Sequence, residues 1–177
     1  MEQTSSAPTI LIAVDIQKGF VTPASAHVVA PLAALQDRFD HVIFTRFHNP
    51  DPSPFREILN YHKLAPDSEE TRLALKPRAD AILIDRPLYT CVTAELRQIL
   101  RRLDAREVYV AGIATEACVL KTVVDLFEAS IVPWVLEDLC ASDKERHFHD
   151  YAIEIMGKLI DPGHIIESAA VRFAQGV

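Results

Sequence analysis

Six short runs of apolar, mostly β-branched residues recur along the chain and constrain its fold more than any other feature. They are Ile10–Val14, Val42–Thr45, Ile82–Ile84, Val108–Ala111, Ile131–Leu136 and Ile165–Ile166. Several are continuously apolar rather than alternating, which is typical of strands covered on both faces. The pattern therefore predicts strands in the interior of a layered domain.

Segments with helical patterning separate these runs. They cover Pro31–Phe39, Pro54–His62, Thr93–Leu103, Thr115–Ala129 and Asp143–Leu159. Thr93 is placed to cap the third helix, and Ser142 and Glu145 have capping-box spacing before the fifth. Because parallel strands are joined by right-handed crossovers, the alternation predicts an α/β three-layer sandwich. We expect a mostly parallel, doubly wound sheet of about six strands with helices on both faces.

Composition fits one globular domain. The chain has 177 residues, of which 49% are hydrophobic and 24% charged, and no compositional shift divides it. We expect a flexible N-terminal tail over residues 1–8 and one domain over 9–177. Three widely spaced cysteines, with no membrane-length apolar run and no leader pattern, predict a soluble cytoplasmic protein. The net charge of −7 argues against nucleic acid as a partner.

Three polar residues follow strands at the edge where ligands of such sheets collect. Asp15 follows the first run, Arg86 the third, and Cys118 the loop after the fourth. Taken singly, Asp15 is a candidate cap or ion-pair partner, Arg86 a surface charge or structural clamp, and Cys118 a small core residue. Taken together they favour a reactive site. The unpaired N–H groups of a helix start favour the thiolate form of Cys118.

Four segments, in order along the chain, resemble the successive signatures of one enzyme family. They are Ile10–Phe20, Val42–Arg46, Val110–Val119 and Val135–Ser142. The set is similar to that of the isochorismatase-like cysteine hydrolases, which include nicotinamidases, N-carbamoyl amide hydrolases and isochorismatases. The resemblance implies a six-stranded parallel sheet with helices on both faces.

The resemblance also implies roles for individual residues. Cys118 would be the nucleophile, and Asp15 would act as its base and later as an acid. A cis peptide bond between Ile113 and Ala114 is implied, with the N–H groups of Ala114 and Cys118 facing the substrate carbonyl oxygen. Thiolate attack forms an oxyanion that such donors stabilise, and the expected product is a thioacyl enzyme that water hydrolyses.

Position 86 departs from the family pattern. The family usually has a lysine three residues before a Tyr-Ser or similar pair, and here that spacing from Tyr89 and Thr90 falls on Arg86. A guanidinium keeps the positive charge, but it is planar, larger and does not release a proton near neutral pH. If the lysine acts only electrostatically, Arg86 can replace it. If compact ammonium geometry is required, the protein is slow, altered in substrate or inactive.

No metal or cofactor is expected. Nicotinamidases carry a zinc cluster after the second strand, where this chain offers His48 but no carboxylate in the expected place, and Asp51 is an uncertain substitute. His147 and His149 are two apart on a predicted helix and point in different directions, which favours surface or packing roles. The five glycines form no dinucleotide or phosphate-binding loop.

The predicted function is hydrolysis of a small amide, carbamoyl or related C–N bond through Cys118. The predicted substrate contacts are Phe20, Phe47, His48 and Tyr89, with Asn49 and Trp134 as further candidates, whereas Cys91 and Cys140 are expected to fill space. Three alternatives remain: an isochorismatase-type vinyl-ether hydrolysis with Asp15 as the acid, an impaired relative that binds a ligand or partner, and, more weakly, a redox sensor. The resemblance also implies a homodimer or homotetramer.

Overall fold

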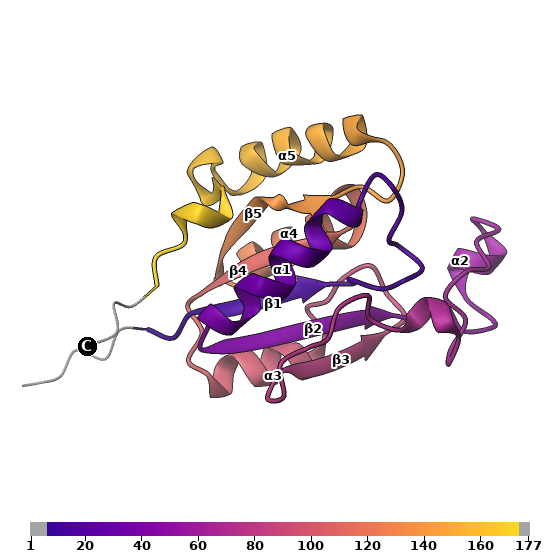
Figure 1. Cartoon of the computed structure of the whole chain (residues 1–177), viewed down its shortest axis with the longest axis horizontal. Helices are drawn as coiled ribbons and strands as arrows, with labels where there is room; N and C mark the ends of the chain where they lie inside the picture. Colours follow the sequence, from indigo (N-terminus) through magenta and orange to yellow (C-terminus); the bar gives the residue numbers. More distant parts are fainter. Residues whose placement is uncertain (1–6, 174–177) are drawn as a thin grey trace, which may run out of the picture.

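The structure, a computed structural model, describes residues 7–173 and contains a six-stranded sheet between two layers of helices (Figure 1). Residues 1–6 of the predicted tail lie outside the described residues. The strands are all parallel, in the order β3-β2-β1-β4-β5-β6. Their bounds are β1 Ile10–Val14, β2 His41–Phe47, β3 Ile82–Arg86, β4 Glu107–Ile113, β5 Val132–Ala141 and β6 Ile165–Ile166. The predicted fold class is confirmed.

Five α-helices and a π-helical turn accompany the sheet. The α-helices are α1 Val29–Leu35, α2 Pro54–Glu57, α3 Ala94–Arg102, α4 Leu120–Glu128 and α5 Arg146–Ile160, and the π-helical turn η4 is Thr115–Val119. Short 3₁₀ helices are formed by Ala26–Val28, Gln36–Arg38, Glu69–Thr71, Pro162–His164 and Ser168–Ala170. None of the helices within residues 7–173 combines the length and apolarity needed to cross a membrane.

The central strand β1 explains why its sequence is continuously apolar. All five of its residues are buried. Ile10, Ile12 and Val14 pack in one core with residues of α3, α4 and α5, while Leu11 and Ala13 pack in a second core with residues of α1. Because side chains alternate between the faces of a strand, a strand covered on both sides needs apolar residues at every position.

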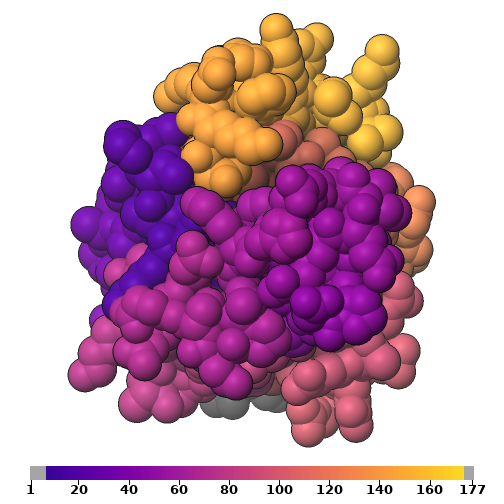
Figure 2. Space-filling view, turned by 90° about the vertical axis from the view of Figure 1, so that its right-hand side faces the viewer, coloured from indigo at the N-terminus to yellow at the C-terminus, as the bar shows by residue number. Residues whose placement is uncertain are grey.

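The topology places one edge of the sheet where a site can form. From β1 the chain moves outward through β2 to β3, and then returns to pair β4 with the other side of β1. The carboxyl ends of β1 and β4 therefore flank the point at which the winding reverses, where ligands of such sheets bind. Figure 2 looks onto this edge, and the segment that follows β2 spreads across it below the orange start of α5.

The predicted helix over Pro54–His62 is wrong beyond its first turn. Ser53 caps α2 by accepting from the N–H of Arg56, but the helix ends at Glu57 and Asn60 has a φ of 50°. The side chain of Asn49 donates to the carbonyl oxygens of Tyr61 and Lys63, at 2.7 and 3.1 Å. These bonds hold an irregular loop where local patterning favoured a helix.

One predicted helix start is confirmed, and two other predicted boundaries differ in the structure. Thr93 caps α3 as predicted, accepting from the N–H of Leu96 at 3.3 Å. The predicted capping box before α5 is wrong, because Ser142 donates to Glu116 at 2.7 Å and Glu145 makes no side-chain cap. Strand β5 continues past its predicted end at Leu136, since its carboxyl half pairs with the end of β4.

Gly112 allows β1 and β4 to approach each other closely at this edge. It has a φ of 145°, and a Cβ added there would lie 2.1 Å from the carbonyl oxygen of Val14. An added side chain would not fit here, and the backbone conformation is one that L-residues rarely adopt. Glycine is therefore required at this position.

Replacing Gly112 by Ala is therefore expected to lower the free energy of unfolding by about 3 kcal/mol, because the added methyl group overlaps the backbone of the central strand. Gly157→Ala is the matched control: its Cβ would meet neighbours at 3.4 to 3.6 Å, and Ala favours a helix interior by about 1 kcal/mol over Gly. Urea unfolding followed by circular dichroism compares the two variants. Equal destabilisation of both would contradict this account of Gly112.

Candidate active site

Three candidate site residues lie at the carboxyl edge of the sheet. Asp15 follows β1 directly, Arg86 is the last residue of β3, and Cys118 lies in η4 after β4. Nη2 of Arg86 forms an ion pair with Oδ2 of Asp15, and both side chains are 0% exposed. Both charges also act on the pKa of Cys118, so the three groups form one electrostatic cluster.

The surroundings of Cys118 favour its neutral thiol over the thiolate. Burial raises the pKa of Cys118 well above its ordinary value, the charge of Asp15 raises it further, and Arg86 offsets only part of the rise. This direction corrects the expectation that the start of a helix favours the thiolate. Desolvation and a neighbouring carboxylate outweigh the helix end here.

Arg86 remains a cation in this environment. Burial alone would lower the pKa of Arg86, but the charge of Asp15 outweighs burial and raises it. Its Nε donates to the sulfur of Cys91 at 3.1 Å. Its Nη1 is buried and has no hydrogen-bond partner within residues 7–173. One N–H-bearing nitrogen of this fixed cation is therefore free for another acceptor.

The turn after β4 carries the predicted oxyanion donors. The peptide bond between Ile113 and Ala114 is cis, as the resemblance implies. The carbonyl oxygen of Ala114 accepts from the N–H groups of Ala117 and Val119, at 3.1 and 3.2 Å. The N–H of Ala114 has no hydrogen-bond partner in the described part of the chain, so it is free to bind a substrate oxygen.

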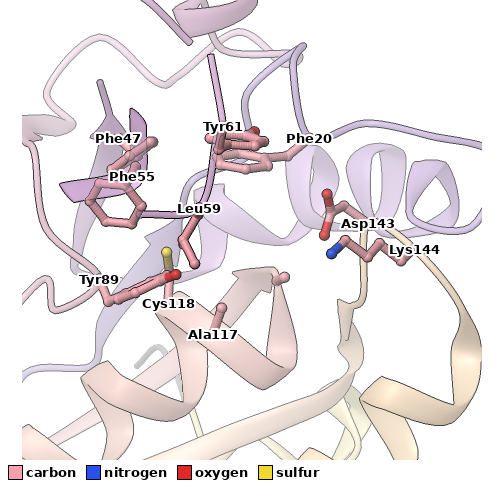
Figure 3. Close-up of a pocket in the computed structure, with 11 residues that line it drawn as sticks. Phe20, Phe47, Phe55, Leu59, Tyr61, Tyr89, Ala117, Cys118, Asp143 and Lys144 are labelled. Atoms are coloured by element: carbon pink, nitrogen blue, oxygen red, sulfur yellow. The ribbon is translucent and has the colours of Figure 1, made fainter. Parts of the chain in front are cut away.

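A cavity of about 320 Å³ lies directly above Cys118 (Figure 3). Apolar and aromatic side chains dominate it, and Asp143 and Lys144 stand together at one side. Its lining residues are Phe20, Phe47, Phe55, Leu59, Tyr61, Tyr89, Ala114, Ala117, Cys118, Asp143 and Lys144.

Four aromatic rings form a continuous wall of this cavity. Phe47 and Phe55 meet edge to face with centroids 4.8 Å apart, and Phe55 and Tyr89 do the same at 4.9 Å. Phe20 extends the wall, with its ring centroid 6.2 Å from that of Phe47. Such contacts hold the rings in defined orientations and leave an apolar surface for a ligand.

His48 does not line this cavity, contrary to the sequence-based expectation. His48 lines a separate hollow with Arg46 and Asp85, which form an ion pair of 2.7 Å.

The residues near His48 do not fit a zinc site. The carboxylate of Asp85 is paired with Arg46, and the exposed carboxylate of Asp51 lies 3.7 Å from Arg56. Within residues 7–173, no three or more His, Cys, Asp or Glu side chains are grouped so that they could hold a metal ion.

The remaining candidates from the sequence make contacts within the fold and do not line the cavity. Asn49 is buried and holds the loop after α2. Trp134 packs on Tyr109 and donates to Glu107 at 3.1 Å, away from the cavity. The two histidines of α5 diverge: His149 is buried with Nδ1 2.9 Å from Oγ1 of Thr115, whereas the exposed His147 lies 3.2 Å from Glu145.

Besides Ala117, five side chains of the cavity were not predicted as site residues from the sequence. Phe55, Leu59 and Tyr61 come from the segment after β2, and Asp143 and Lys144 from the β5–α5 connection. The signal that could have found them is topological, since both segments leave the carboxyl ends of strands at this edge.

Comparisons with known proteins identify the family and the fold of the chain. The isochorismatase domain model matches residues 9–166. Among solved structures, a cysteine hydrolase from Pseudomonas syringae pv. phaseolicola is 20% identical, with a TM-score of 0.82 over 92% of this chain and 90% of that one. A search of curated proteins gives no match.

Two further solved structures are named amidases. Pyrazinamidase of Pyrococcus horikoshii, solved in complex with zinc, is 20% identical, with a TM-score of 0.78 over 90% of this chain and 99% of that one. N-carbamoylsarcosine amidase of Thermoplasma acidophilum is 22% identical, with a TM-score of 0.73 over 85% and 93%. These likenesses show a shared fold. The domain match spans most of the chain, which therefore belongs to the isochorismatase family of hydrolases.

Proposed function

We propose that this protein hydrolyses a small amide or carbamoyl compound through a thioacyl intermediate on Cys118. The observation that carries the proposal is a thiol at the floor of a cavity, in electrostatic contact with the buried pair of Asp15 and Arg86. A nucleophile beside a base, with the base oriented by a third group, is the recurring arrangement of covalent hydrolases.

The acylation step uses Asp15 as the proton carrier. As the sulfur of Cys118 bonds to the substrate carbonyl carbon, its proton passes to Asp15, and the oxyanion accepts from the N–H groups of Ala114 and Cys118. Asp15 then returns the proton to the leaving nitrogen as the C–N bond breaks. Arg86 keeps its charge throughout, because a guanidinium does not release its proton.

Deacylation repeats the sequence with water. Asp15 accepts a proton from water as its oxygen attacks the thioacyl carbon, and the same N–H groups bind the second oxyanion. The C–S bond then breaks, the carboxylic or carbamic acid leaves, and the sulfur of Cys118 recovers the proton from Asp15. The raised pKa of Cys118 favours this last step, since a thiolate of high basicity takes up a proton readily.

The cavity favours a small substrate with an apolar, planar body. Its volume of about 320 Å³ is near the lower end of the range of about 300 to 1,000 Å³ for ligand pockets. The wall from Phe20 to Tyr89 is aromatic. Two of the structural neighbours are named for amide or carbamoyl substrates, which supports the same substrate class.

Replacing Cys118 by Ala is expected to abolish hydrolysis and the covalent adduct, because the attacking sulfur is lost. The measurement is ammonia release from a panel that includes pyrazinamide and N-carbamoylsarcosine, together with intact-mass detection of the acyl protein. Cys140→Ala makes the same change at another buried cysteine, outside the cavity, and is expected to retain both signals.

Two results would reject the mechanism. Undiminished hydrolysis of isochorismate by the Cys118→Ala protein would favour acid catalysis of vinyl-ether cleavage by Asp15. Binding of panel compounds to the native protein, with neither turnover nor an adduct on Cys118, would favour a ligand-binding role.

Arg86 is expected to tolerate lysine better than glutamine. Glutamine leaves the carboxylate of Asp15 buried without a countercharge, which costs about 3 to 5 kcal/mol of folding stability and removes the cation beside Cys118. Lysine keeps the charge but loses the planar fork. Turnover and urea unfolding of both variants measure this difference. Equal loss of activity in the two would show that the charge is not what Arg86 supplies.

A further inference from the structure

Four buried side chains form a closed ring of hydrogen bonds beside the cavity. Nε of Arg86 donates to the sulfur of Cys91 at 3.1 Å, and that thiol donates to Oγ1 of Thr45 at 3.3 Å. Thr45 in turn donates to Oδ1 of Asp15 at 2.8 Å. The ion pair between Oδ2 of Asp15 and Nη2 of Arg86 closes the ring. Each of the four side chains is 0% exposed.

The direction of every hydrogen bond in this ring is consistent. Thr45 receives the thiol proton of Cys91 and gives its own to Asp15, and the guanidinium donates at both ends. The ring requires Cys91 to be a neutral thiol. Burial raises the pKa of Cys91, and this outweighs the opposing charge of Arg86, so the donor proton is present.

Cys91 is also held from outside the ring. Its backbone N–H donates to Oγ1 of Thr122 on α4 at 3.1 Å. Thr45 belongs to β2 and Arg86 to β3, while Asp15 follows β1. The sulfur of Cys91 is therefore held in place as an acceptor for Nε of Arg86. Asp15 binds the guanidinium at Nη2, so the two contacts together orient its plane.

The role of this sulfur depends on an arginine at position 86. Arginine carries an N–H at Nε in addition to its two terminal nitrogens, whereas lysine carries donors only at its ammonium group. With Nε on Cys91 and Nη2 on Asp15, the plane of the guanidinium is determined and Nη1 remains without a partner in the described residues.

We propose that Cys91 is a positioning residue whose sulfur orients Arg86, so that one edge of the guanidinium pairs with Asp15 and Nη1 stays available to the sulfur of Cys118 or to the substrate. The proposal deepens the proposed function and rests on it for the identity of the reaction. Cys91 itself does not line the substrate cavity. The prediction from sequence that Cys91 only fills space is replaced by this role.

The test is a double-mutant cycle that needs no substrate. The proteins are the native chain, Cys91→Ala, Arg86→Lys and the double variant. The readout is the rate of iodoacetamide alkylation against pH, localised to Cys118 by peptide mass spectrometry. The coupling between the two residues is the difference between the effect of Cys91→Ala on the alkylation rate in the native protein and its effect in the Arg86→Lys protein.

In the native background, Cys91→Ala is expected to slow alkylation of Cys118 at a fixed pH by about tenfold, equivalent to about one pH unit in its midpoint. A guanidinium that has lost its acceptor stabilises the thiolate less well. In the Arg86→Lys background the same change is expected to have less than about a twofold effect, because lysine has no Nε donor for Cys91 to bind. Cys91→Ser keeps an acceptor and is expected to restore most of the native rate.

Two outcomes would overturn the proposal. An equal effect of Cys91→Ala in both backgrounds would show a packing role that does not act through Arg86, and no effect in the native background would show no role. Failure of the proposed function would give a different result. No acyl adduct would form on Cys118 with the substrate panel, but the alkylation rates of the four proteins could still be compared, because that experiment needs no substrate.

Discussion

The buried ion pair between Asp15 and Arg86 is the interaction on which the site depends. It joins the ends of β1 and β3 across β2, whose Thr45 binds the same carboxylate. Neither side chain reaches solvent. A buried charge without its partner is destabilising, so replacing either residue alone by a neutral one lowers the stability of the fold. The packing of these three strands and the charged part of the site therefore depend on each other.

The same pair determines how protons move in the proposed reaction. Arg86 does not exchange its proton near neutral pH, so the transferable proton is shared between Asp15 and Cys118 alone. Burial and the charge of Asp15 raise the pKa of Cys118, which favours the proton on the thiol before a substrate binds. The reactive sulfur is then formed only as a substrate arrives. At the position where the sequence analysis expects a lysine, Arg86 is a cation with more donors and a fixed plane.

The sequence was sufficient for features set by local patterning. Continuous apolar runs predicted the strands, and Thr93 predicted a helix start. Features set by distant partners were missed. The side chain of Asn49 imposes a loop on a segment with helical patterning, and the thiolate expected at Cys118 is disfavoured by burial and by a carboxylate far away in sequence. Cys91 could not be assigned, because its role exists only where three strands meet. The oligomeric state stays a prediction.

The central claim is that the charge of Asp15 acts directly on the thiol of Cys118. It is tested by the pH dependence of Cys118 alkylation in the native protein and in Asp15→Asn, with folding checked by circular dichroism. The account predicts a native midpoint above that of an ordinary thiol, about 8.5, and a lower midpoint in Asp15→Asn, where the carboxylate is gone and Arg86 acts unopposed. An unchanged or higher midpoint in Asp15→Asn would contradict it.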